Sequence, residues 1–228
     1  MSRISIIVPV LNEASGVAAA LGALARARAA GHEVIVVDGG SSDGTAAAAA
    51  PLADRVLSAP RGRASQMNAG AAVASGDLLL FLHADTRLPP DAHEWLGERL
   101  DAAALAWGRF DVRIDGRHPL LAVIAFLMNA RSRLTGIATG DQAIFVRRAA
   151  FAALGGFPAI ALMEDVAFSV AAKRLSRPLC LRERVVTSGR RWESNGVVRT
   201  MLLMWWLRLR FFLGASPDRL HRSYYGPR

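Results

Sequence analysis

Short apolar runs rich in β-branched residues alternate with Ala- and Leu-rich segments along the first half of the chain. Such runs predict strands buried on both faces, and the segments between them predict connecting helices. The expected strands are residues 4–10, 33–37, 55–57 and 77–82, and the expected helices are residues 13–30, 45–52, 62–75 and 89–103. Repeated strand–helix units favour an α/β fold with a mainly parallel sheet and helices on both faces.

The second half of the chain is less regular. Its pattern predicts strands at residues 107–114, 143–146 and 184–187, and helices at residues 119–134, 163–175 and 197–213. No linker separates two domains by composition. We expect one α/β domain over residues 1–192, with a C-terminal apolar and basic helical extension over residues 193–228 packed on it.

Composition limits the compartment in which the chain works. Its 228 residues include one cysteine, Cys180, so neither an internal disulfide nor a multi-cysteine zinc site is expected, and a reducing, cytoplasmic location is the default. The apolar run at residues 4–11 is interrupted by Pro9 and lacks a cleavage site, so no signal peptide is expected. The apolar runs at residues 120–128 and 201–207 are also shorter than the roughly 20 residues that span a bilayer.

The formal charge of +9 is unevenly distributed. Residues 1–114 carry a balance of −2 and residues 115–228 a balance of +11. A basic chain can bind nucleic acid, anionic lipid or phosphorylated ligands, but no basic-aromatic nucleic-acid module accompanies this charge. The ratio of 27 Arg to one Lys is equally explained by a compositional bias, which leaves the asymmetry between the halves unexplained.

Polar clusters follow three of the expected strands, at residues 12–13, 38–45 and 83–85. Ligands of parallel α/β sheets bind at the carboxyl ends of the strands, so these clusters are candidate site residues. The segment from Asp38 to Thr45 offers carboxylates and hydroxyls to a nucleoside, or forms an ordinary turn that caps a helix. Asp85 can hold a divalent cation, or cap the helix that follows Pro89.

Two further clusters lie in the second half. Glu164 and Asp165 are adjacent carboxylates whose repulsion can raise the pKa of one of them toward the range of a general base, although they also suit a helix start. Arg191 and Trp192 follow a strand, and an arginine there can bind a phosphate group or simply lie on the solvent-exposed surface. No phosphate-binding G-x-x-x-x-G-K-[ST] loop and no G-x-G-x-x-G motif after the first strand occurs.

The order of these clusters resembles the family 2 glycosyltransferases over about residues 4–192. The resemblance rests on residues 6–13 (IIVPVLNE), 36–45 (VVDGGSSDGT), 61–70 (RGRASQMNAG), 83–85 (HAD) and 164–165 (ED). More narrowly, residues 139–142 (TGDQ) and the region from Arg191-Trp192 to Trp205-Trp206 resemble a small bacterial group associated with arsenosugar or selenium-related gene clusters.

This resemblance implies a GT-A fold and an inverting transfer from a nucleotide-diphosphate sugar of the UDP or GDP type to an unknown acceptor. It assigns nucleotide or substrate contacts to Pro9, Glu13, Asp38, Gly62, Asn68, His83, Arg191 and Trp192. It assigns Mn²⁺ or Mg²⁺ to Asp85, and the role of base to Asp165 or, second, to Glu164. His83 stands where the family has the first aspartate of its D-x-D motif, and Ser188 stands where its Q-x-x-R-W motif has glutamine.

Two other functions fit the same residues: a nucleotide-sugar binding protein without catalysis, and a sugar nucleotidyltransferase, whose glycine-rich N-terminal loop is absent. The helix expected at residues 197–213 is very apolar but carries Arg199, Arg208 and Arg210 without a clean amphipathic stripe. It can pack on the core, contact a second copy of the chain, or lie on an anionic membrane surface.

Overall fold

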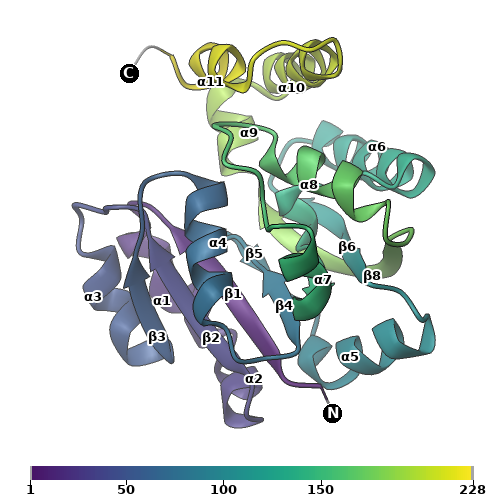
Figure 1. The fold of residues 1–228 in the computed structure, drawn as a ribbon. Coiled ribbons are helices and arrows are strands. Elements are labelled where there is room, and N and C mark those ends of the chain that lie inside the picture. Colours follow the sequence, from purple (N-terminus) through teal and green to yellow (C-terminus); the bar gives the residue numbers. More distant parts are fainter. Residues whose placement is uncertain (1, 227–228) are drawn as a thin grey trace.

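The computed structural model describes residues 2–226, and within that range it forms one sheet of eight strands in the order β3-β2-β1-β4-β7-β6-β8-β5 (Figure 1). The strands are β1 (Ile4–Val10), β2 (Glu33–Asp38), β3 (Arg55–Ser58), β4 (Leu78–Phe81), β5 (Thr86–Arg87), β6 (Trp107–Asp115), β7 (Phe145–Arg147) and β8 (Leu179–Ser188). Strands β3, β2, β1 and β4 are mutually parallel, as are β6 and β8, whereas β7 and β5 run antiparallel to their neighbours. The expected mainly parallel α/β sheet is confirmed.

Helices cover both faces of this sheet because successive residues of the central strands point to opposite sides. In β1, Ile6 and Val8 pack with Val17 of one helical layer, while Ile7 packs with Met67 of the other. The first layer contains α1 (Ala14–Gly22), α2 (Ala25–Ala29), α3 (Thr45–Ala49) and α5 (Ala92–Ala102). The second contains α4 (Arg63–Val73), α7 (Arg148–Ala153) and α8 (Glu164–Ala172).

Four further helices complete the second half of the chain. They are α6 (Leu120–Thr135), α9 (Arg190–Asn195), α10 (Val197–Phe212) and α11 (Pro217–Tyr225), of which α10 and α11 lie together at the top of Figure 1. The side chain of Leu207 on α10 is fully buried and packs with Met163 and Val166 at the start of α8. Within the described residues, no helix combines the length and apolarity needed to cross a membrane.

Several expected boundaries are wrong for local reasons. The helix expected at residues 13–30 divides into α1 and α2, because Leu24 leaves the helical conformation and turns its side chain into the core. Strand β8 is longer than the expected residues 184–187, and β7 begins after Ala143, whose φ of 46° is not a strand conformation. The division expected after Trp192 falls inside α9, so that boundary between two domains stays a prediction.

Candidate functional site

The loops after β1 and β2 are hydrogen-bonded into one surface at the carboxyl edge of the sheet. The backbone N–H of Asn12 donates to Ser41 Oγ over 2.9 Å, and that of Glu13 donates to Thr45 Oγ1 over 2.8 Å. Asp38 ends β2 directly beside Val10 of β1. Two of the three polar clusters found in the sequence are therefore adjacent in space.

Asp38 is a buried carboxylate that shapes the loop after β2. It is 5% exposed and accepts hydrogen bonds from the backbone N–H and the hydroxyl of Ser41. Pro9 lies in β1 beside Val37. Asp43 accepts from the N–H and hydroxyl of Thr45 and from the N–H of Ala14, so this loop is held by its own hydrogen bonds. The expected helix cap is not formed, because the N-cap of α3 is Gly44 and no side chain caps the helix.

The first turn of α4 faces the same edge. Gly62 precedes the helix with a φ of 142°, a conformation that favours glycine. Asn68, expected on the nucleotide side, instead uses both ends of its amide on the main chain of Phe157, at 2.8 and 2.9 Å. These two bonds fasten α4 to the loop that precedes α8.

His83 and Asp85, which follow β4, have different surroundings. His83 is buried, and its Nδ1 lies 3.4 Å from Oδ1 of Asp141. Asp85 is exposed, and its carboxylate accepts a long 3.4 Å hydrogen bond from Thr86. It does not cap α5, which begins at Ala92 after Asp91.

Asp165 and Glu164 open α8 and point in different directions. The carboxylate of Asp165 is partly exposed and accepts hydrogen bonds from the N–H groups of Gly140, at 2.8 Å, and Val166, at 2.7 Å. Glu164 is buried, and burial followed by the charge of Asp165 raises its pKa to about 7. Asp165 is thus ordered and accessible, whereas Glu164 is buried and holds its proton more tightly than an ordinary glutamate does.

Asp141 is a site residue that the sequence analysis did not single out. Burial alone would raise its pKa, but the hydrogen bond and charge of His83, with the charges of Arg63 and Arg191, lower it to about 2. The carboxylate is therefore ionised throughout the physiological range. The sequence did offer one signal, because Asp141 belongs to the TGDQ segment at residues 139–142.

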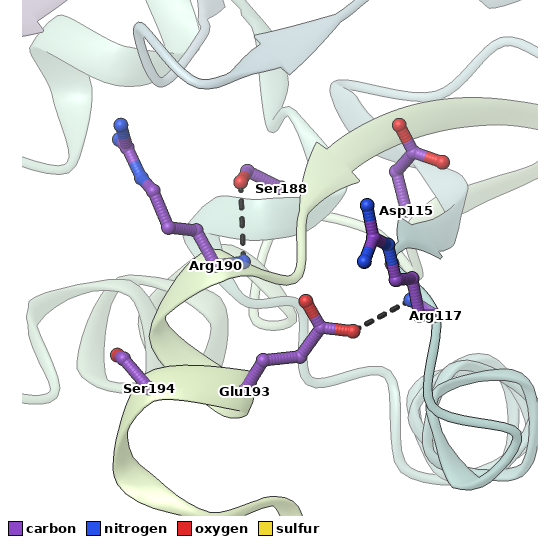
Figure 2. Close-up of a pocket in the computed structure, with 7 residues that line it drawn as sticks. Asp115, Arg117, Ser188, Arg190, Glu193 and Ser194 are labelled. Carbon is purple, nitrogen blue, oxygen red and sulfur yellow. Dashed lines mark hydrogen bonds between the residues drawn. The ribbon is translucent and has the colours of Figure 1, made fainter.

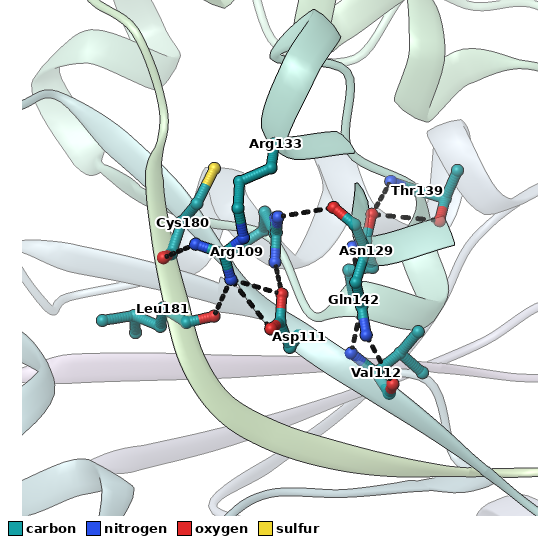
Figure 3. Close-up of polar contacts among 9 residues, drawn as sticks. All are labelled: Arg109, Asp111, Val112, Asn129, Arg133, Thr139, Gln142, Cys180 and Leu181. Atoms are coloured by element: carbon teal, nitrogen blue, oxygen red, sulfur yellow. Dashed lines mark hydrogen bonds and ion pairs between the residues drawn. The ribbon is translucent and has the colours of Figure 1, made fainter. Parts of the chain in front are cut away.

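A buried polar network supports the loop that carries Asp141 (Figure 3). Asn129 of α6 bonds both the N–H and the C=O of Val112 in β6, at 2.8 and 2.9 Å, and its Oδ1 also accepts from Gln142. Gln142 in turn accepts from the N–H of Thr139. This chain of hydrogen bonds links the sheet to residues 139–142, whose Gly140 holds Asp165.

Gly140 is also in close contact with His83. A Cβ atom at this position would lie 2.5 Å from His83 Nε2, so no larger residue fits without displacing the imidazole. The loop at residues 139–142 therefore touches both the β4 cluster through His83 and the α8 cluster through Asp165. It is the segment that joins the two halves of the candidate site.

The ends of β6 and β8 and helix α9 line an open groove (Figure 2). Its rim carries Asp115, Gly116, Arg117, Ser188, Arg190, Glu193 and Ser194. Ser188 donates its N–H to the backbone O of Asp85, and Arg190 lies 3.6 Å from the carboxylate of Glu13. The groove therefore continues the carboxyl edge of the sheet but does not include Asp165.

Arg191 and Trp192 lie in α9 at this end of the molecule. Arg191 donates to the hydroxyl of Tyr224 over 2.8 Å, and its guanidinium lies 5.5 Å from the centre of the tyrosine ring. Trp192 packs with Leu121 and Val197 in an apolar cluster. The tryptophan therefore has a packing role that does not depend on a ligand.

The residues at Asp85 offer a divalent metal an incomplete set of protein ligands. Among residues 2–226, no group of three or more His, Cys, Asp or Glu side chains could hold a metal ion. The carboxylate of Asp85 is exposed and forms no ion pair with the described residues. That donor set fits a cation shared with a diphosphate, because Mg²⁺ is commonly held by one or two carboxylates together with substrate phosphates and water.

Comparison with known proteins identifies the family to which the chain belongs. The family model described as Glycosyl transferase family 2 matches residues 5–154. A curated "PGL/p-HBAD biosynthesis glycosyltransferase" of Mycobacterium bovis (strain BCG / Pasteur 1173P2) is 41% identical over 91 residues, covering 37% of this chain and 36% of the relative. The match therefore spans about a third of that relative's length.

Two solved structures have a similar fold. The mannosyltransferase PcManGT from Pyrobaculum calidifontis, in complex with GDP-Man and Mn²⁺, has a TM-score of 0.62 and 23% identity over 81% of this chain and 56% of its own. TarS 1-349 of S. aureus, in complex with UDP-GlcNAc, has a TM-score of 0.65 and 18% identity over 82% of this chain and 58% of its own. At these low sequence identities, the similarity shows a shared fold only.

Proposed function

The chain belongs to glycosyl transferase family 2, and on that premise we propose that it moves a sugar from a nucleotide-diphosphate sugar to an acceptor hydroxyl group, inverting the anomeric centre. The observation that carries the proposal is the position of Asp165. Its carboxylate is partly exposed, is fixed by two N–H groups, and is joined by residues 139–142 to the His83 loop that leads to Asp85. An ordered base and a candidate diphosphate site are thus connected by one short loop.

The reaction follows from these positions. The acceptor oxygen attacks the anomeric carbon as the bond from that carbon to the diphosphate oxygen breaks, and the nucleoside diphosphate leaves with the electron pair. Asp165 accepts the proton of the acceptor hydroxyl, the role that a positioned carboxylate serves in general base catalysis. Glu164 is the weaker candidate for this role because its side chain is buried, whereas that of Asp165 is partly exposed and accessible to an acceptor.

On the donor side, the loops at residues 12–13 and 38–45 surround the nucleoside, with Pro9, Glu13 and Asp38 beside it. Gly62 leaves the start of α4 open to the nucleotide, whereas Asn68 acts through the loop at Phe157. A divalent cation at Asp85, either Mn²⁺ or Mg²⁺, would neutralise charge on the leaving diphosphate. The GDP-Man and Mn²⁺ complex of the archaeal mannosyltransferase supports this donor class.

Donor binding can be tested without knowing the acceptor. Thermal unfolding of the full chain with UDP, GDP and their sugars, with and without Mn²⁺, should show a rise in Tm for one nucleotide class, because a ligand of the folded state stabilises it by mass action. Asp85→Ala should remove the part of that rise that depends on Mn²⁺. Binding without release of nucleoside diphosphate, over a panel of donors and acceptors, would favour a nucleotide-sugar binding protein instead.

We further propose that the outer face of α10 meets an anionic membrane surface on the cytoplasmic side. One face of α10 is buried on the molecule, while the other exposes a set of large apolar side chains: Val198, Leu202, Trp205, Trp206, Leu209 and Phe212. Residues 190–228 carry eight arginines against two acidic residues, which complements anionic lipid. A second copy of the chain is the competing occupant of this face.

A further inference from the structure

A small apolar cluster surrounds the turn that presents Asp165. It is distinct from the two larger clusters that pack on the faces of the sheet, and it combines the chain before residues 139–142, the start of α8 and the C-terminal helices α10 and α11. Its buried side chains are Ile137, Leu162, Met163, Val166, Leu207 and Leu220. The packing around the candidate base is therefore completed by residues from the C-terminal part of the chain.

Met163, the residue before Glu164, has an unusual backbone conformation. Its φ of 70° and ψ of 23° lie in the left-handed region, and it occupies the N-cap position of α8, where no side chain caps the helix. This region is costly for a residue with a Cβ atom, and such strain persists only where the surrounding structure imposes it. Met163 is 6% exposed, so the contacts that can hold this turn are those of the apolar cluster.

Leu207 of α10 is a fully buried member of this cluster and packs with Val166, the residue after Asp165. The N–H of Val166 donates to the carboxylate of Asp165 over 2.7 Å, and that of Gly140 donates over 2.8 Å. Gly140 lies three residues after Ile137, which is another member of the cluster. Both donors to Asp165 thus belong to segments that the cluster anchors.

Helix α11 connects the same cluster to Arg191. Tyr224 packs against the cluster, and its hydroxyl accepts a hydrogen bond from Arg191 over 2.8 Å. Leu207 and Leu220 are side chains that α10 and α11 bury in the cluster. The C-terminal helices therefore contact both the turn of the candidate base and the arginine expected on the substrate side.

We propose that Leu207 is a positioning residue for the candidate base. By filling the space beside Met163 and Val166, it keeps the turn in its left-handed conformation and so fixes the direction of the Asp165 carboxylate. This inference deepens the proposed function and rests on it for the role of Asp165. The alternative is that Leu207 only anchors α10, in which case its loss lowers stability without a specific effect on transfer.

Turnover of the full chain tests the positioning role. Leu207→Ala should lower kcat at least about tenfold and leave the donor KM within about twofold, because the base is displaced while the nucleoside loops stay intact. Leu96→Ala is the matched control, since Leu96 on α5 is also fully buried but packs in the helical layer of α1. At a temperature where all variants are folded, this control should keep the wild-type kcat. Leu207→Met, which nearly conserves side-chain volume, should retain most of it.

Hydrogen exchange supplies a readout that does not need turnover. In Leu207→Ala, the amides of residues 137–142 and 163–168 should exchange at least about tenfold faster, an increase larger than that of β1. Leu96→Ala should not produce this difference between the two regions. Leu207→Val removes a single methylene and should show the same changes on a smaller scale, so it replaces the alanine variant if that variant does not fold.

Three results would overturn the proposal. The first is wild-type exchange at residues 137–142 and 163–168 in Leu207→Ala, whatever its turnover. The second is an equal fall of kcat in Leu96→Ala, which would assign the effect to general destabilisation. The third is faster exchange with a wild-type kcat in Leu207→Ala. Turnover of Asp165→Asn then shows where the failure lies, because an inactive variant leaves the proposed function standing and an active one overturns that function as well.

Discussion

At the scale of single residues, the neighbours Glu164 and Asp165 show how position within one helical turn separates two carboxylates. Glu164 points into the protein and is 5% exposed, whereas Asp165 is partly exposed and is held by backbone N–H groups. The adjacent pair in the sequence predicted that the pKa of one carboxylate would be raised. The sequence could not show which of the two is affected, because burial makes the larger contribution.

The raised pKa of Glu164 predicts a specific dependence of stability on pH. The folded protein holds this proton up to about pH 7, whereas the ordinary pKa of a glutamate side chain is 4.5, so the folded state binds more protons than the unfolded state between these pH values. Stability should therefore fall as pH rises from about 4.5 to 7, by about 3 kcal/mol from this one group. Glu164→Gln should remove that fall and be more stable than the wild type at pH 8.

The measurement is urea unfolding at pH 4.5, 6, 7 and 8. Glu98→Gln, an exposed substitution on α5, serves as the control and should follow the wild-type curve. An unchanged slope with pH in the Glu164→Gln variant would show that Glu164 titrates normally.

At the scale of helices and strands, the sequence predicts an element best when the residues of that element alone determine its conformation. Strands β1, β2 and β4 were expected because each is an apolar run buried on both faces, and the structure has them at nearly those positions. Strand β5 is only two residues long and α9 only six, so neither gives a clear periodic pattern.

The residues of the candidate site also fall into those that the sequence predicts and those that depend on tertiary packing. Residues that follow strands were found from the pattern, because a parallel sheet collects its carboxyl ends at one edge. Asp141 was not found as a site residue because its proximity to His83 depends on the conformation of residues 139–142.

The hydrogen bonds between α6 and β6 predict a cost for removing Asn129. Asn129→Leu leaves both main-chain groups of the buried Val112 without their side-chain partner, and each such group costs about 1–3 kcal/mol. We expect the free energy of unfolding to fall by at least about 2 kcal/mol in urea titrations. The exposed Asn195→Leu on α9 should change it by less than about 0.5 kcal/mol.

Turnover should fall further than this loss of stability explains, because Asn129 also holds Gln142 and through it the loop at Asp165. A variant that unfolds like the wild type would show that this network does not stabilise the fold. Full turnover in a destabilised but folded variant would separate the network from the candidate site.

At the scale of the whole molecule, the two halves of the chain differ in charge and supply different parts of the candidate site. The first half of the chain supplies the loops that we propose for the nucleoside, and the basic second half supplies α10. The outer face of α10 is apolar, and its buried Leu207 packs with Val166, the residue after Asp165. An acceptor presented at a membrane surface would thus be close to the candidate base. The resemblance to the arsenosugar and selenium-associated group stays a prediction.

Membrane contact can be measured by flotation of the full chain with vesicles that contain anionic lipid. Trp205→Ser combined with Leu209→Ser should reduce binding, because withdrawing two side chains from lipid costs about 2 kcal/mol, or roughly thirtyfold in partitioning. Leu175→Ser, an exposed substitution outside α10, should not. Dimers in sedimentation experiments, without vesicle binding, would assign the face to a second copy of the chain.

The central claim is that Asp165 acts as the base of a sugar transfer, and the most direct measurement compares nucleotide binding with turnover in Asp165→Asn. The amide keeps the shape of the side chain but cannot accept the acceptor proton. The account predicts that the variant binds the donor nucleotide like the wild type while release of nucleoside diphosphate falls by about 10²–10⁴-fold. Wild-type turnover in Asp165→Asn, with normal nucleotide binding, would contradict it.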